Sequence, residues 1–309
     1  MDGLLLAHAG PGHVPPPLTP LRLLTGWTFE PVVAVLVIVT AGLYLYGVHR
    51  LRSRGDRWSL WRTLSFNVLG LGSAVVATMS AVGTYDTVLL SVHMVQHMVL
   101  NMLVPIFLAL GAPITLALRT LPSRPRRLLV RTIHSRVAKT LTFPLVAMAI
   151  FVANPFVLYF SGLYEATLRN AVLHDLSHLH FVAVGCLWFW PLLGLDPMPL
   201  RPAYPLRMLA AFATVPFHAF LGVAIMSMTD VIAADWYTSL DRQWGASLLS
   251  DQRTAGAILW AAGDLVALLI LGVLFLQWAS ASEREAERED RRLDRLEAAA
   301  RAQAESQGG

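Results

Sequence analysis

Long apolar stretches recur along the chain, and polar residues gather between them. Each stretch holds about 18–24 residues, the length that one helix needs to cross the hydrocarbon core of a bilayer. Their approximate limits are 31–48, 64–82, 88–110, 141–160, 173–195, 208–231 and 255–278. The pattern therefore predicts an all-α membrane protein, folded as a bundle of seven transmembrane helices.

The loops between these stretches differ in charge, which predicts an orientation. Basic residues are concentrated in the loops that follow the first, third and fifth stretches, whereas the alternate loops contain few. The basic loops contain Arg50, Arg52, Arg54, Arg57 and Arg62, then Arg119, Arg124, Arg126, Arg127, Arg131, Arg136 and Lys139, then Arg201 and Arg207. Because positively charged loops stay in the cytoplasm, we expect the N-terminus outside and the C-terminus inside a bacterial plasma membrane, crossed several times.

Three segments follow from this topology. Residues 1–30 are expected to form an exposed N-terminal segment, residues 31–278 the seven-helix transmembrane domain, and residues 279–309 a charged cytoplasmic tail. Opposite charges at helical spacing in the tail, such as Glu287 and Arg291, predict that it is helical.

Composition excludes several classes of protein. The chain is 55% hydrophobic and only 14% charged, with a mean hydropathy of +0.55, whereas soluble domains carry about 25% charged residues. This argues against a soluble enzyme, a nucleic-acid-binding protein and a disordered chain. Cys186 is the only cysteine, which excludes disulfides within the chain and metal sites built from several cysteines.

Histidines within the apolar stretches form the main candidate site, since ionisable residues are costly inside a membrane. His93 and His97 lie early in the third stretch, and His174 and His178 early in the fifth. Residues four apart share one helix face, and both stretches enter from outside in the predicted topology. The four imidazoles should therefore lie at one depth near the outer leaflet. Imidazole is a ligand for copper, zinc, iron and nickel, so we expect a shared metal or haem site.

Other residues in the stretches add to this site or pack beside it. His218, midway along the sixth stretch, is a further candidate ligand. Asp264, in the seventh, is expected to be a hydrogen-bond partner of a ligand, a direct ligand or a packing residue. Met94, Met98 and Met226 offer thioethers, which favour Cu(I), although methionines at helical spacing are also typical of plain packing.

Four motifs, in this order, resemble a known family. They are His93-Met94-Val95-Gln96-His97-Met98 followed by Gly111-Ala112-Pro113; His174 and His178 leading into Trp188-Phe189-Trp190-Pro191; Phe217-His218-Ala219-Phe220-Leu221-Gly222; and Asp251-Gln252 followed by Gly256, Trp260 and Gly263. Together they resemble the polytopic CtaG family of cytochrome c oxidase assembly proteins, the multi-span family rather than the single-span copper chaperone that shares the name. Asp251-Gln252 is also typical of a helix cap.

The resemblance implies a non-enzymatic assembly factor that helps to deliver copper to the catalytic centre in subunit I of a haem–copper oxidase. Copper, expected as Cu(I), would arrive from outside the cytoplasm, where an extracytoplasmic copper chaperone is a further expected partner.

Three other functions fit the same residues. An intramembrane zinc-dependent hydrolase would use the histidines with Asp175 or Asp264 to activate water. A haem-binding electron carrier would use imidazoles from two helices as axial ligands. A scaffold would bind oxidase subunits without metal. Metal content, a hydrolase assay and an absorption spectrum distinguish these alternatives.

Overall fold

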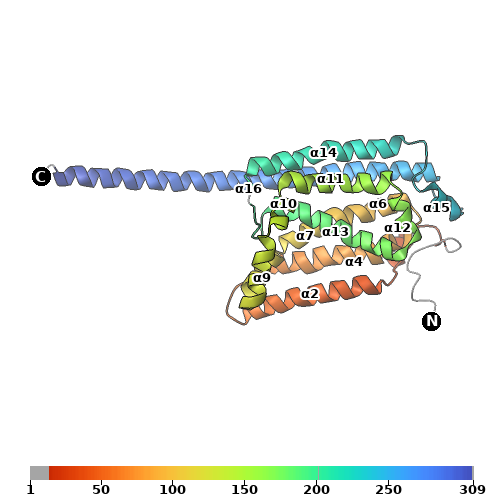
Figure 1. Cartoon of the computed structure of the whole chain (residues 1–309), viewed down its shortest axis with the longest axis horizontal. Coiled ribbons are helices and arrows are strands. Elements are labelled where there is room, and N and C mark those ends of the chain that lie inside the picture. Colours follow the sequence, from red (N-terminus) through yellow and green to blue (C-terminus); the bar gives the residue numbers. More distant parts are fainter. Residues whose placement is uncertain (1–13, 201, 308–309) are drawn as a thin grey trace.

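The computed structural model describes residues 14–200 and 202–307. Residues 1–13 of the predicted N-terminal segment therefore lie outside the described residues. Helices, and no strand, make up the regular structure of the described part. Most of them run side by side in one bundle, and the last extends far beyond it (Figure 1). The predicted all-α membrane bundle is confirmed.

Six helical runs in the described residues are long and apolar enough to cross a membrane. Two of them are composite: Leu60–Tyr85 joins four elements and Leu90–Leu110 joins three. The runs are α2 (Pro31–Arg52); α3 (Leu60–Leu64), η1 (Ser65–Leu71), α4 (Gly72–Met79) and α5 (Ala81–Tyr85); α6 (Leu90–Met98), η2 (Val99–Leu103) and α7 (Val104–Leu110); α13 (Ala171–Leu193); α14 (Tyr204–Ser227); and α16 (Leu248–Gln307).

The stretch predicted at 141–160 differs from the others. It forms α11 (Pro144–Phe160), which is followed after a bend of 69° by α12 (Leu163–Arg169). Only the two together match the length and hydropathy of a span, so the bundle has a seventh crossing if this bent pair is counted as one.

Short helices lie at the two ends of the bundle (Figure 1). At the end near the described N-terminal residues lie α1 (Pro20–Thr25), α12 and α15 (Ala234–Ser239). At the opposite end lie α8 (Pro113–Thr120), α9 (Ser123–Ile133) and α10 (Arg136–Leu141). The break expected at Gly111-Ala112-Pro113 separates α7 from α8, where Ala112 adopts a left-handed backbone with φ of 49°.

Two close helix contacts place the candidate site. Gly185 of α13 lies against η2, where an added Cβ would be 2.1 Å from the carbonyl oxygen of Asn101. Gly222 of α14 and Gly256 of α16 face each other, and an added Cβ on either would lie 2.7 Å from the other's carbonyl oxygen. Small residues at such positions let membrane helices approach closely, so α13 packs directly on the helical run that carries His93 and His97.

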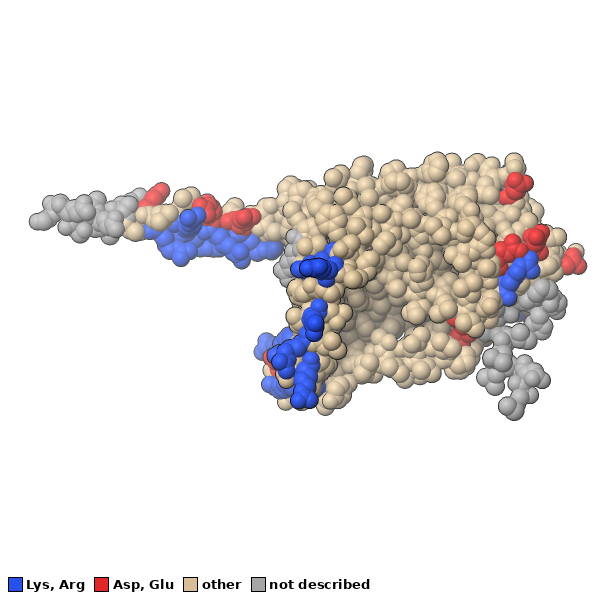
Figure 2. Space-filling model, viewed as in Figure 1, with Lys and Arg blue, Asp and Glu red and all other residues tan. Residues whose placement is uncertain are grey.

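Basic residues are concentrated at one end of the bundle. Figure 2 shows lysine and arginine gathered where α8, α9 and α10 lie and, together with acidic residues, along the projecting part of α16, whereas the opposite end shows acidic residues and a smaller group of basic ones. The positive-inside rule would put the arginine-rich end in the cytoplasm, which is the predicted orientation.

Candidate metal centre

Four histidines meet between α6 and α13. Their rings form a continuous row, with centroid distances of 6.5 Å from His97 to His93, 6.3 Å from His93 to His174 and 4.5 Å from His174 to His178. All four side chains are buried. The i, i+4 spacing turns each pair towards the other helix, so two segments about 80 residues apart in sequence supply one cluster.

Asp86 adds a carboxylate to one side of this row. It lies in the loop between α5 and α6 and is completely buried. Its Oδ2 is 3.0 Å from Nε2 of His174 and 3.9 Å from Nε2 of His178. One potential ligand atom from each of these three residues lies within 4.8 Å of the others. Metal–ligand bonds to nitrogen and oxygen are about 2.0–2.2 Å long, so side-chain shifts would be needed to bring all three onto one ion. Binding through Nε2 of either histidine would also require that nitrogen to be unprotonated.

His93 stands out because neither of its ring nitrogens has a hydrogen-bond partner among the described residues. The side chain is only 1% exposed, and its ring lies 4.8 Å from that of Tyr164. Nearly all buried polar atoms in proteins are hydrogen-bonded, so an unpaired one needs an explanation. A metal about 2.0 Å from each of two facing nitrogens would hold ring centroids about 6 Å apart, close to the 6.3 Å between His93 and His174.

Tyr159 orients His97. The Tyr159 hydroxyl lies 2.9 Å from Nδ1 of His97 and donates to Sδ of Met94 at 3.7 Å. A tyrosine hydroxyl has one proton, so when that proton points to the sulfur, its oxygen accepts from Nδ1–H of His97. Nε2 of His97 then carries the lone pair that a metal needs. Hydrogen bonds of this kind fix the tautomer and direction of metal-binding histidines.

Gln96 fixes the orientation of the His178 ring. Its Oε1 accepts from Nε2 of His178 at 3.0 Å, and its Nε2 donates to the carbonyl oxygen of Ala77 at 3.0 Å. The amide therefore links α13, α6 and α4. His180, two residues further along α13, is exposed and bonds instead to Oδ1 of Asn154 at 2.8 Å.

The start of α6 is held by a residue from the far end of the sequence. The carboxylate of Asp251 accepts from the backbone N–H of Leu90 at 2.7 Å and of Ser91 at 3.4 Å, and also from the Ser91 hydroxyl. Asp251 therefore caps α6, two to three residues before His93, rather than its own helix α16. Nearby, Nε1 of Trp236 donates to the carbonyl oxygen of Thr87 at 2.8 Å, which fixes the loop that carries Asp86.

Glu30, directly before α2, lies at the edge of the cluster. Its side chain is buried, and this burial, reinforced by the negative charges of Asp175 and Asp86, raises its pKa to about 7, although His174 opposes the shift. Tyr237 of α15 lies 2.6 Å from the Tyr164 hydroxyl, and burial raises the pKa of Tyr237.

Comparison with known sequences assigns the chain to a family. The profile of a family described as cytochrome c oxidase caa3 assembly factor (Caa3_CtaG) matches residues 42–281. The chain belongs to this family. The matched region contains the four histidines, Asp86 and Asp251, but neither Glu30 nor the end of α16.

Three mycobacterial proteins described as uncharacterized are similar to this member of the Caa3_CtaG family. Those of Mycobacterium bovis and Mycobacterium tuberculosis are each 38% identical over 91% of the chain, and that of Mycobacterium leprae is 37% identical over the same share. The chain spans only 44% of the length of each relative. No solved structure matches it.

Some residues predicted for the site of this Caa3_CtaG protein lie in other contacts. Nδ1 of His218 is 3.1 Å from the carbonyl oxygen of Thr214, and its ring lies 5.7 Å from that of Phe151 rather than against one of the four clustered imidazoles. Asp264 accepts from Nε1 of Trp260, on its own helix, at 2.7 Å.

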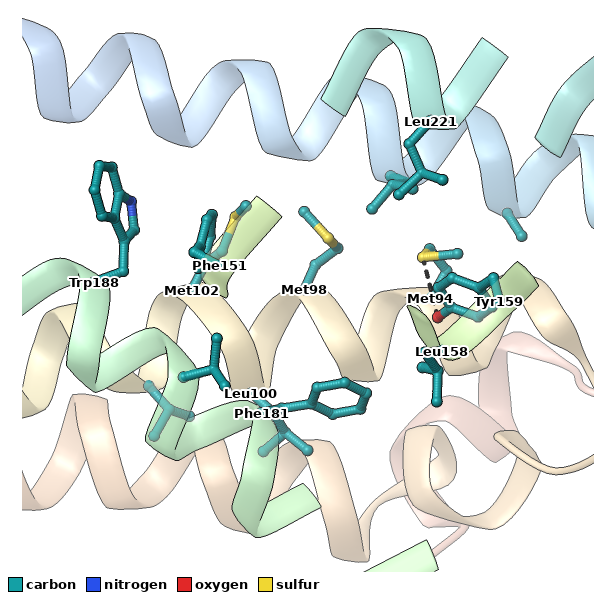
Figure 3. Packing of buried hydrophobic residues seen from close by; sticks show 14 of the residues in the cluster. Met94, Met98, Leu100, Met102, Phe151, Leu158, Tyr159, Phe181, Trp188 and Leu221 are labelled. Carbon is teal, nitrogen blue, oxygen red and sulfur yellow. Dashed lines mark hydrogen bonds between the residues drawn. The ribbon is translucent and has the colours of Figure 1, made fainter. Parts of the chain in front are cut away.

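Of the three predicted methionines, one contacts the histidine cluster through Tyr159 and two lie in other contacts. Met94 is linked to the cluster through Tyr159. Met98 points with Met102 towards α14 and α16 in the hydrophobic core, near Leu221 (Figure 3). Met226 packs against α16, where a Cβ added to Gly256 would lie 2.7 Å from its Cγ.

Proposed function

We propose that this member of the oxidase assembly family binds copper, as Cu(I), through His93, His97, His174 and His178, and helps to insert it into subunit I of a haem–copper oxidase. Family membership supplies the role in oxidase assembly. The observation that carries the copper proposal is the buried row of four imidazoles, in which His93 has no other hydrogen-bond partner among the described residues. Imidazole suits copper, and a nearby thioether such as that of Met94 favours the reduced ion.

Asp86 joins this proposal as a residue that the sequence did not suggest. Its carboxylate accepts from His174 and lies 3.9 Å from His178. In this role it either orients His174 towards the ion or binds the ion itself. His218, Asp264, Met98 and Met226 stay as predicted participants, to be tested beside the four histidines.

The position of the cluster supports delivery from outside the cytoplasm. The histidines lie near the starts of α6 and α13, at the end of the bundle away from the arginine-rich helices α8, α9 and α10 (Figure 1). With that arginine-rich end in the cytoplasm of a bacterial plasma membrane, copper would arrive from an extracytoplasmic chaperone and pass sideways to the oxidase.

Metal analysis of the purified full-length protein tests the site. After loading with Cu(I) under reducing conditions, we expect the unaltered protein to retain copper. His93→Ala with His97→Ala, His174→Ala with His178→Ala, and Asp86→Asn should each strongly reduce retention. His180→Ala is the matched control. It removes a histidine from the same helix α13, but that histidine bonds to Asn154 outside the cluster. Undiminished copper in the fourfold histidine variant would exclude this site.

A deletion strain tests the cellular role. Oxidase subunits should be made but lack copper and activity, and added copper should partly restore both if the protein delivers the metal rather than acting as a scaffold. A fully metallated and active oxidase in the deletion strain would reject the assembly role.

The zinc hydrolase remains the alternative that one observation favours. Asp86, His174 and His178 form a set of two imidazoles and one carboxylate, which is also a known ligand set for catalytic zinc. Retention of zinc in preference to copper, together with hydrolytic activity that requires His174, would replace the copper proposal.

A further inference from the structure

Helix α9 crosses the arginine-rich end of the bundle. Figure 1 shows it nearly perpendicular to the long helices, beside the ends of α2 and α7. None of its residues is buried. It has only 11 residues, and an isolated helix of this length is only marginally stable in water. A surface that is not part of the described chain would therefore stabilise it.

The two faces of α9 indicate the nature of this surface. Arg124, Arg127 and Arg131 recur at helical spacing on one side, with the exposed Leu128 beside Arg124. Leu129 and Ile133, which are partly buried, lie on the other side, with Arg126 at its edge. The sequence contains no Asp or Glu from residue 113 to residue 164. A basic face beside an apolar face is the pattern of a helix that lies in the headgroup region of a membrane. Because α9 crosses the end of a membrane-spanning bundle, it lies where headgroups would be.

An apolar groove opens next to this helix. It has a volume of about 410 Å³ and lies between α2 and α8, with Leu43, Gly47, Leu116 and Ala117 among its lining residues. Arg50 also lines it, and among the described residues the Arg50 guanidinium has no hydrogen bond or ion pair. Leu121, another lining residue, precedes Arg124 by only three positions. An apolar channel with cations at one end fits an amphiphile with a negative headgroup.

We propose that the α2–α8 groove and α9 together bind one anionic phospholipid from the leaflet at the arginine-rich end. Its acyl chain lies in the groove, and its headgroup phosphate meets Arg50 and Arg124, with Arg127 beside them. Arginine suits this role because its planar guanidinium pairs with phosphate oxygens in a bidentate manner. Arg119 contributes less, because it already lies 3.3 Å from Asp56. This proposal does not depend on the metal site.

Native mass spectrometry of the full-length protein in detergent tests the proposal. Phosphatidylglycerol and phosphatidylcholine with the same acyl chains are titrated separately, and bound lipid is counted. We expect phosphatidylglycerol to bind at least about tenfold more tightly, since each arginine near an anionic surface contributes about fivefold. The triple variant Arg50→Gln, Arg124→Gln and Arg127→Gln should lose this preference.

Two further variants separate the site from general charge and from folding. Arg288→Gln, Arg291→Gln and Arg295→Gln in the projecting part of α16 remove the same charge and should leave lipid binding unchanged. Ala117→Phe fills the groove without changing charge and should weaken binding of both lipids. The proposal is overturned by equal binding of the two lipids, by an equal loss in the α16 variant, or by unchanged binding in Ala117→Phe. Equal lipid binding combined with capture of an acidic oxidase subunit by α9 would assign the surface to a protein instead.

Discussion

Replacing His93 by leucine should stabilise the metal-free protein. Both ring nitrogens of His93 are buried without a hydrogen-bond partner among the described residues, and each such atom costs about 1–3 kcal/mol. Leucine has neither atom and is close in size to the imidazole that lies among the rings of its neighbours His97, Tyr164 and His174. The loss of the ring contact with Tyr164, at 4.8 Å, offsets about 0.5–1.5 kcal/mol of the gain. The two atoms together cost about 2–6 kcal/mol, so the net expectation for His93→Leu is a free energy of unfolding higher by about 0.5–5.5 kcal/mol.

The assay is thermal unfolding of the full-length protein in detergent, with and without Cu(I). Without metal, the gain corresponds to a melting temperature higher by about 1–20 °C, at about 2–4 °C per kcal/mol for a larger chain. With copper at about 100 times its dissociation constant, the unaltered protein should gain about 2.7 kcal/mol, and His93→Leu should gain much less. The variant would therefore be the more stable protein without metal and the less responsive one with it.

Two other histidines supply the comparison. His97→Leu removes the partner of Tyr159, and His180→Leu removes a side chain bonded to Asn154, so neither should stabilise the metal-free protein. If His93→Leu lowers the melting temperature as much as His97→Leu does, then the unpaired nitrogens carry no cost and the reasoning is wrong.

Four further outcomes are expected. Tyr159→Phe frees Nδ1 of His97 and should weaken Cu(I) binding about 10–100-fold in a competition assay with a chromophoric chelator, and unchanged affinity would show that Tyr159 does not orient His97. Gly185→Ala places a Cβ 2.1 Å from the Asn101 carbonyl oxygen and should cost about 1–3 kcal/mol in thermal unfolding, whereas Gly42→Ala, which meets nothing within 4 Å, should be neutral or slightly stabilising. The pKa of Glu30 in the folded protein is raised to about 7. Protonated Glu30 therefore stabilises the fold fully at low pH, and this stabilisation is lost as pH rises through 7. The fall in melting temperature of the metal-free protein from pH 6 to pH 8 should accordingly be smaller in Glu30→Gln than in the unaltered protein. Reporter fusions after Arg127 and at the C-terminus should read cytoplasmic and one near Asp241 external, and an external reading at Arg127 would reverse the orientation.

Hydropathy predicted the bundle well because the bilayer demands long apolar helices whose backbone bonds are satisfied internally. It could not predict the bend between α11 and α12, which depends on how Ser161 and Gly162 interrupt an otherwise apolar segment. The i, i+4 rule, which is local, predicted that each histidine pair shares one helix face, and the topology predicted that the two pairs lie at one depth.

The rest of the site depends on contacts that local patterns do not contain. Asp86 falls between the predicted stretches 64–82 and 88–110, where no local pattern marks it, and its partner His174 is 88 positions away. Tyr159 gave no signal, because an aromatic residue near the end of a span is typical of any membrane helix. The cap that Asp251 provides was expected for its own helix, and only packing against α6, 160 positions earlier, shows which helix it caps.

The unbroken length of α16 has a mechanical consequence. Residues 279–307 extend about 40 Å past the bundle at 1.5 Å per residue, and Asp251 at the opposite end of the same helix holds the start of α6. One continuous helix therefore connects the residue that caps α6, beside the histidine cluster, to a tip that lies far outside the bundle (Figure 1). A tilt of about 10° in the bundle would swing the far tip by about 7 Å, so a rearrangement too small to resolve around the histidines becomes a displacement that a distance measurement on the tail can follow.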